Sequence, residues 1–218
     1  MEPLFKNVVV GLVPQPRQIP PPPFRKEDLQ RLYVDITRDY PYQQFSFLPA
    51  DAGAQLVNPP EDAVVIQPGL LQIQAKIELT TEAVREKCMA VFRATVERLN
   101  IESFLQCGIK VVAHVAAPGA SPDAKAFVAQ QLMQGQERVE ELPAGFFGGG
   151  VKYRRLDAER EDNLLIEPFI HDNEFVFIDY DVARVVTGQP FQGIDHVATW
   201  LDEDFSFVSG HAMSLLQA

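Results

Sequence analysis

The sequence predicts an α+β fold in which an antiparallel, curved sheet is backed by long helices, and three observations predict it. Apolar and polar residues alternate over residues 71–79, as in a half-buried strand. Residues 25–40 and 80–100 instead carry apolar side chains at helical spacing. The order strand, helix, several short strands and longer helix then occurs twice. We therefore expect two β-α-βββ(β)-α pseudo-repeats, residues 1–100 and 101–218, packed as one continuous unit.

The first repeat opens with a short strand. Residues 7–13 are rich in β-branched side chains and stop at Pro14, which predicts a buried strand. Residues 19–23 include four consecutive prolines and must be extended, because proline fixes φ and disfavours helix in the residue before it. We interpret this stretch as a stiff connector within the chain. A polyproline ligand for an SH3-type partner is the alternative.

The first amphipathic helix begins at Arg25 and ends before Pro41. Its apolar stripe consists of Leu29, Leu32, Tyr33, Ile36 and Tyr40. Three short alternating runs then predict strands at residues 45–48, 54–57 and 63–67. After the strand at 71–79, Thr80 suits an N-cap and Glu82 suits the first turn of a helix that ends near Asn100.

The second repeat begins with a predicted strand at residues 107–115. Ser121 and Pro122 then suit the N-cap and first turn of a helix that runs through Phe127, Val128 and Leu132. Three strands follow at residues 151–156, 164–170 and 174–182, and residues 171–173 form the turn between the last two.

A terminal helix completes the second repeat. Its apolar stripe is Ile194, Val197, Leu201, Phe205 and Val208. We expect this stripe to pack on the sheet, the acidic run 202–204 to face outward, and the helix to loosen near Gly210. No Lys or Arg follows Arg184, whereas Asp195, Asp202, Glu203 and Asp204 do. These acids indicate a solvated helix face or, alternatively, a docking site for a basic partner.

Composition bounds the class of protein and its partners. The chain is 46% hydrophobic and 22% charged, values typical of a folded globular protein. Its net charge of −11 would repel a phosphate backbone, so nucleic acid is an unlikely partner. The sequence shows neither a secretion signal nor an apolar run long enough for a membrane span. Cys88 and Cys107 are expected to be buried free thiols, with a catalytic thiol as the alternative. A soluble protein in the cytoplasm follows as the expectation.

One segment is predicted to bind a ligand. Residues 145–150 contain the chain's glycine cluster, which lacks the patterns of known phosphate-binding loops. Basic side chains follow it and could attract an anion, although a flexible entry to the next strand is the simpler interpretation. The candidate residues are Gly148, Gly149, Gly150, Lys152, Arg154 and Arg155.

Other chemistry finds little support in the sequence. Asp179 and Asp181 share one face of a strand and could hold a cation or share a proton, with a polar outer face as the alternative. His114 is expected on the solvated face of its strand and His171 in a turn. The four histidines lack the spacing of a helical metal site. We predict no catalytic residue, metal or cofactor.

The whole chain resembles an uncharacterised, sporadically distributed prokaryotic family of about this length. The resemblance rests on the opening strand and proline-containing link, Asp39-Tyr40-Pro41, the segment from Phe104 to Val111, and the acidic-aromatic stretch from Trp200 to Phe207. The family has no assigned activity, so the resemblance implies no catalytic residues.

The doubled element order also resembles that of TATA-binding proteins, whose two repeats form a saddle-shaped sheet backed by helices. That resemblance implies fold alone, because a DNA-binding saddle needs a basic face.

The leading functional hypothesis is a non-enzymatic binding or assembly protein that acts through its sheet face or its terminal helix. Its partner would be another protein or a second copy of itself. The alternative is an enzyme or small-ligand sensor with a cavity between sheet and helices. Nucleic-acid binding is a third possibility, and it depends on how the 19 basic residues are distributed.

Overall fold

The computed structural model describes residues 1–60, 62–77, 80–132, 149–185 and 190–217. They form an α+β structure around one curved, antiparallel sheet of ten strands. The strands are β1 (Leu4–Pro14), β2 (Gln44–Phe47), β3 (Ala54–Asn58), β4 (Asp62–Gln67), β5 (Leu70–Lys76), β6 (Ser103–Ala116), β7 (Val151–Leu156), β8 (Arg160–Pro168), β9 (Phe175–Val185) and β10 (Phe191–Gln192). The helices are α1 (Lys26–Asp39), α2 (Thr81–Leu99), α3 (Ala124–Leu132), α5 (Asp195–Phe207) and α6 (Met213–Leu215). The predicted fold class is confirmed.

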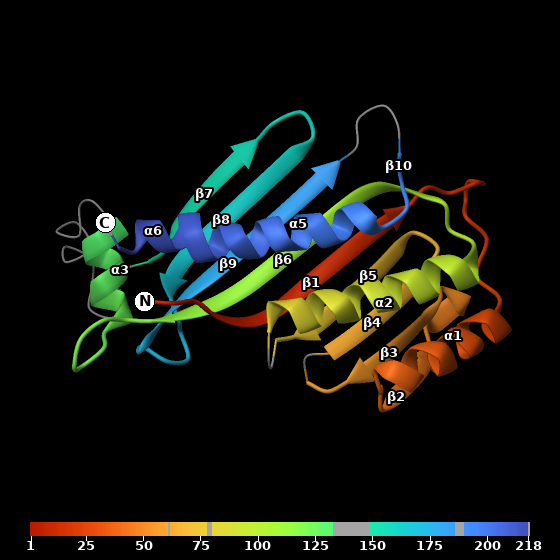
Figure 1. Ribbon diagram of the computed structural model, residues 1–218, viewed down its shortest axis with the longest axis horizontal. Coiled ribbons are helices and arrows are strands. Elements are labelled where there is room, and N and C mark those ends of the chain that lie inside the picture. Colours follow the sequence, from red (N-terminus) through yellow and green to blue (C-terminus); the bar gives the residue numbers. More distant parts are fainter. Residues whose placement is uncertain (61, 78–79, 133–148, 186–189, 218) are drawn as a thin grey trace.

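The sheet is organised around the central pair of strands β1 and β6. Its order is β2-β3-β4-β5-β1-β6-β9-β8-β7, and the short β10 also pairs with β6. On one side of the central β1–β6 pair lie β5, β4, β3 and β2, which all come from the first half of the chain. On the other side lie β9, β8 and β7, which all come from the second half. One sheet thus runs through both halves of the chain, as Figure 1 shows.

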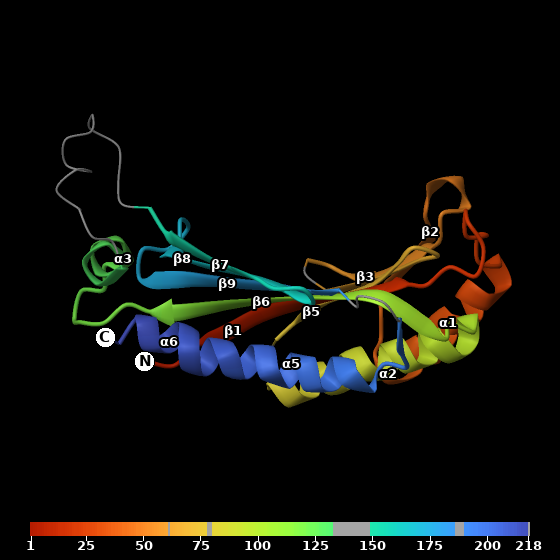
Figure 2. The same ribbon diagram turned by 90° about the horizontal axis from the view of Figure 1, so that it is seen from above.

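The long helices lie on one side of the sheet. In Figure 2, α1, α2 and α5 cover the same face, and both ends of the sheet bend toward the opposite side. We call that opposite side the open face, because no helix among the described residues covers it. α3 lies at one end of the sheet (Figure 2).

The hydrophobic core fills the layer between sheet and helices. In the central strands every second side chain is fully buried: Val8, Val10 and Leu12 in β1, and Cys107, Ile109 and Val111 in β6. The helices contribute side chains such as Leu32, Phe92 and Leu201, which are also 0–1% exposed. Burying each large apolar side chain stabilises the fold by roughly 1.5–3 kcal/mol. This layer is therefore the main source of stability.

The predicted boundaries are confirmed for α2 and need correction elsewhere. Thr80 Oγ1 accepts a hydrogen bond from the Ala83 amide at 3.1 Å, and α2 ends where Asn100 adopts the left-handed conformation. The N-cap expected at Ser121 is wrong. α3 begins at Ala124, and Asp123 Oδ1 caps it by accepting from the Ala126 amide at 3.0 Å. An ionised carboxylate suits a helix start, which explains the later boundary.

Several strands differ in length from the prediction. β1 spans Leu4–Pro14 rather than residues 7–13, and β6 spans Ser103–Ala116 rather than residues 107–115. β5 ends at Lys76 rather than at residue 79, and residues 78–79 lie outside the described part of the chain. β8 begins at Arg160, four residues before the expected start, and ends at Pro168. The early start follows from the pairing of Glu161 and Asp162 with the end of β7, which their polar sequence conceals.

The terminal helix packs as expected, with one exception. Val197, Leu201, Phe205 and Val208 are at most 5% exposed, and the helix widens into a π-helical turn at Val208–Ala212, around Gly210. The outward orientation expected for Asp204 is wrong, because this side chain is completely buried. It lies three residues after Leu201 and four before Val208, so helical geometry places it on the packed face.

The acids of α5 bind cations of the same chain. Arg93 reaches Asp195 at 3.5 Å and Arg85 reaches Asp202 at 2.6 Å, so α5 is linked to α2. Glu203 and Asp204 both contact Arg184 of β9, at 3.7 and 2.6 Å. Asp195, Asp202 and Glu203 remain exposed, as expected of a solvated helix face, and only Asp204 departs from that interpretation.

Membrane insertion through a helix finds no support in the described residues. None of their helices combines the length and the apolar character that crossing a bilayer requires.

Candidate functional site

The open face carries the side chains that alternate with the core positions. Its composition differs between the two halves of the sheet. In the first half, amide and β-branched residues dominate, as in the neighbours Val9 and Gln74 and the cross-strand pair Val65 and Gln72. In the second half, aromatic and charged side chains take these positions. The second half is therefore the more distinctive surface.

Four rings gather on the open face at one end of the second half. They come from β6, the residue that follows β8 and the start of β9, and we call them the aromatic cluster: His114, Phe169, Phe175 and Phe177. His114 lies 4.2 Å from Phe169 and 5.9 Å from Phe177, measured between ring centroids. The strand register produces the cluster by placing His114 opposite Phe177.

The cluster is half-buried, although no helix among the described residues covers this face of the sheet. All four rings are partly exposed, and the nearby turn residue Ile170 is 72% exposed. Burial lowers the pKa of His114, and the positive charge of Lys6 lowers it further. The expected solvated position of His114 is therefore only partly right, since the imidazole packs against phenylalanines on the open face.

Charged side chains continue the open face from the cluster toward the middle of β9. Asp179 and Asp181 share this face, as the sequence predicts. Lys110 Nζ lies 2.6 Å from Asp179 Oδ2, while Asp179 Oδ1 is buried and accepts no hydrogen bond within the described residues. Desolvation raises the pKa of Asp181, and the neighbouring Asp179 carboxylate also raises it against the opposing effect of Lys110. These groups form an ion-paired surface, and among the described residues no third acid or histidine joins the two aspartates as a potential cation ligand.

The predicted anion site is only partly contained in the described residues. Gly148 lies outside the described residues, and Gly149 and Gly150 are exposed at the start of β7. A Cβ on Gly150 would lie 2.4 Å from Glu167 Cβ, so this glycine permits close strand approach. The register places Lys152 and Arg154 on the open face but Arg155 on the other face.

The two arginines of that candidate site already have acidic partners. Arg154 contacts Glu161 at 2.9 Å and Arg155 contacts Asp162 at 2.5 Å. No single ligand can be held by all three cations from one side of the strand.

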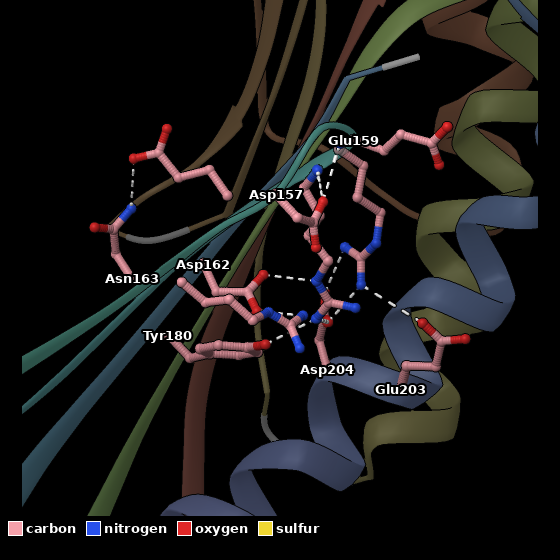
Figure 3. A network of polar contacts seen from close by, with 11 residues as sticks. Asp157, Glu159, Asp162, Asn163, Tyr180, Glu203 and Asp204 are labelled. Carbon is pink, nitrogen blue, oxygen red and sulfur yellow. Dashed lines mark hydrogen bonds and ion pairs between the residues drawn. The ribbon is translucent and has the colours of Figure 1, made fainter. Parts of the chain in front are cut away.

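Sequence reasoning missed a buried ionic network between β8, β9 and α5 (Figure 3). Arg184 donates two hydrogen bonds to Asp204, at 2.9 and 2.6 Å. Arg160 donates to Asp162 at 2.6 Å and to the Tyr180 hydroxyl at 2.8 Å, and it reaches Asp204 at 3.4 Å. Figure 3 shows these groups converging between the sheet and the helix.

The ionisation of this network follows from its burial. Burial raises the pKa of Asp204, against the hydrogen bonds from Arg184 that lower it. Burial also raises the pKa of Tyr180 to about 12. Each buried charge has a charged partner, so the network is built to hold α5 on the sheet.

The first half has a smaller polar group at the rim of its helix layer. Lys87 of α2 contacts Asp62 of β4 at 2.5 Å and lies over the Tyr42 ring. Burial raises the pKa of Tyr42, and the Asp62 carboxylate adds to this effect. The Tyr42 hydroxyl and Asp62 Oδ1 are both buried without a hydrogen-bond partner among the described residues. An open hollow of about 420 Å³ lies beside this pair, at the start of α2.

Catalytic chemistry is not assembled at the cysteines. Cys88 and Cys107 are buried free thiols, as predicted. Burial raises the pKa of each thiol to about 12, so neither forms the reactive thiolate near neutral pH.

Comparison with known proteins adds no family or relative. No protein-family model matches the chain, and no curated protein matches it either. The resemblances to the sporadically distributed family and to TATA-binding proteins therefore stay predictions.

Proposed function

We propose that this chain is a non-enzymatic binding protein that engages another protein through the open face of its sheet. The observation that carries the proposal is the aromatic cluster. Clustered aromatic side chains supply large contact areas in protein interfaces, and an exposed apolar patch on a folded protein often marks such a site.

The terminal helix is a weaker candidate for the interaction surface. Its apolar stripe is buried against the sheet, and its acids bind Arg85, Arg93 and Arg184 of the same chain. A partner would have to displace these contacts. The open face offers a surface that costs no such displacement.

The alternative, an enzyme or sensor with a cavity between sheet and helices, has less support. The side chains that face the helices from β1 and β6 are 0% exposed at Val10 and Ile109, and helix side chains such as Leu32 and Phe92 pack in the same layer. A small ligand would instead have to use a hollow at the rim, such as the one beside Asp62 and Lys87.

The proposal includes a cytoplasmic location and a partner other than nucleic acid. Two buried, unpaired thiols in a chain of this size suit a reducing compartment. The net charge of −11 disfavours a phosphate backbone.

The test compares partner capture by the wild-type protein, by Phe177→Ser and by Gln72→Ser. Phe177→Ser changes the aromatic cluster, whereas Gln72→Ser is the matched control on the open face of the first half. A protein captured from the host by wild type would be purified, and its affinity for all three chains would be measured by calorimetry. We expect the cluster variant to bind at least tenfold more weakly, since truncating a central aromatic residue of an interface costs about 2 kcal/mol or more.

Equal affinity for wild type and Phe177→Ser would reject the aromatic cluster as the site. A monomeric wild-type chain that captures nothing would count against the whole proposal.

A further inference from the structure

The outer edge of β7 is a feature of the sheet separate from the open face. β7 is the last strand in the sheet order and pairs only with β8 among the described residues. An edge strand presents backbone N–H and C=O groups that can pair with an added strand. The edge strand at the other end, β2, has four residues against six in β7.

The β7 strand itself is rich in cations. Lys152, Arg154 and Arg155 are three of its six residues, and all three are exposed. The side chains of Arg154 and Arg155 remain 59% and 56% exposed although each contacts an acid on β8. A guanidinium has five N–H donors, so each arginine can also donate hydrogen bonds to a second carboxylate on the free side of the strand.

The cations are distributed over both faces of the strand. Lys152 and Arg154 project from the open face, while Tyr153 and Arg155 project from the other. Successive side chains of an added strand would point to opposite faces of the sheet. One set would lie beside Lys152 and Arg154, and the other would lie beside Tyr153 and Arg155. Acids at every second position would meet Lys152 and Arg154 together.

We propose that the free edge of β7 binds an acidic, extended segment of a partner protein by strand addition. The inference does not rest on the function proposed for the aromatic cluster. Two copies of this chain would pair poorly here, because antiparallel β7 strands would bring cations of one copy beside cations of the other. Charged edge residues protect a sheet from such self-pairing, but they favour an acidic strand.

The experiment uses the full chain and two short, capped probe peptides. One alternates glutamate with valine, and the other alternates lysine with valine. Amide hydrogen exchange of Val151–Leu156 would be followed with each peptide, because strand addition protects the edge amides. We expect the glutamate peptide to slow exchange in β7 and its affinity to fall as salt screens the charges.

A charge variant tests the role of the cations. Lys152→Gln combined with Arg154→Gln should weaken the glutamate peptide by about three- to tenfold, given the modest strength of exposed ion pairs. Arg31→Gln, an exposed position on α1, is the matched control and should bind like wild type.

Three results would overturn the inference. The glutamate peptide could leave β7 exchange unchanged, the lysine peptide could protect it equally, or the protein alone could protect β7 by dimerising. The last result would identify a second copy as the occupant. None of them bears on capture through the aromatic cluster, so the two proposals fail separately.

Discussion

The two halves of the sheet each hold an aspartate, a cation and a tyrosine against a helix, but at different depths. In the first half, Asp62 and Lys87 have side chains 17% and 18% exposed. In the second half, Asp204 is 0% exposed and the side chain of Arg184 is 7% exposed. The first group lies at the rim of the helix layer, and the second lies within it.

The difference shows how burial changes what a charge requires. The rim pair leaves the Tyr42 hydroxyl and Asp62 Oδ1 buried without hydrogen-bond partners among the described residues. The deep group gives Asp204 two hydrogen bonds from Arg184 and gives the Tyr180 hydroxyl one from Arg160. A buried charge is tolerated only when it is paired and hydrogen-bonded. The deep network therefore fixes one position of α5 on the sheet.

The largest expected effect comes from removing the helix that carries Asp204. A chain ending at Gly193 loses six large apolar side chains buried to 5% exposure or less: Val197, Leu201, Phe205, Val208, Met213 and Leu216. Each stabilises the fold by roughly 1.5–3 kcal/mol, and together they rival the net stability of a domain, roughly 5–15 kcal/mol. We expect the truncated chain to unfold or aggregate in a thermal melt, whereas a chain ending at Ala212 should lose much less. An unchanged melting midpoint at Gly193 would contradict the packing of α5.

A smaller effect compares the two aspartates directly. Asp204→Ala leaves Arg184 buried without its main partner and should cost about 3–5 kcal/mol of unfolding free energy. Asp62→Ala should cost about 1 kcal/mol, because Lys87 can extend its ammonium group to solvent. Urea unfolding of both variants measures the difference.

The control for this comparison is Asp204→Asn, which keeps the shape and removes the charge. It should fall between wild type and Asp204→Ala. Equal losses for Asp62→Ala and Asp204→Ala would show that depth of burial does not decide the strength of these pairs.

Much of the fold could be predicted from periodicity. The alternation in residues 71–79 and the helical stripes of α1, α2 and α5 identified elements that the structure contains. These signals work because burial on one face imposes a period of two on strands and 3.6 on helices. The start of β8 at Arg160 was missed because polar residues end the periodic pattern before the strand pairing ends. The start of α3 at Ala124 was missed because Asp123, rather than the earlier Ser121, caps the helix.

The sequence does contain an indication of the buried ionic network, but it is easily missed because charged residues are normally expected at the surface. Asp162 is in phase with Leu164 and Ile166, Arg184 is in phase with Tyr180 and Val182, and Asp204 is in phase with Leu201 and Val208. A charged residue at a core position of its own element indicates a buried partner elsewhere. The pairing itself could not be predicted, because it depends on where α5 crosses β8 and β9.

The aromatic cluster was missed for a related reason. Phe175 and Phe177 occupy the positions of β9 that face away from the core, and His114 does so in β6. Each residue alone is an ordinary exposed ring. The register between β6 and β9 brings them together, and a single sequence does not reveal register between strands so far apart.

The smallest expected effect is a pH dependence of stability that arises in the second half of the chain. All four histidines lie in the second half, and the one on the open face is His114, next to Lys6 and Asp172. Burial and Lys6 lower its pKa below the ordinary value of about 6.5, so the unfolded chain binds the proton more tightly than the folded chain. The stabilising contribution of the neutral imidazole is therefore present above about pH 6.5 and is lost as the pH falls through the lower folded pKa.

His114→Phe keeps a ring in the aromatic cluster and removes the titration, so its urea midpoint should fall less than that of wild type between pH 7.5 and pH 5. Parallel curves for the two proteins would mean that the His114 imidazole is as well solvated in the folded chain as in the unfolded one, and the cluster would then be too open to bury it.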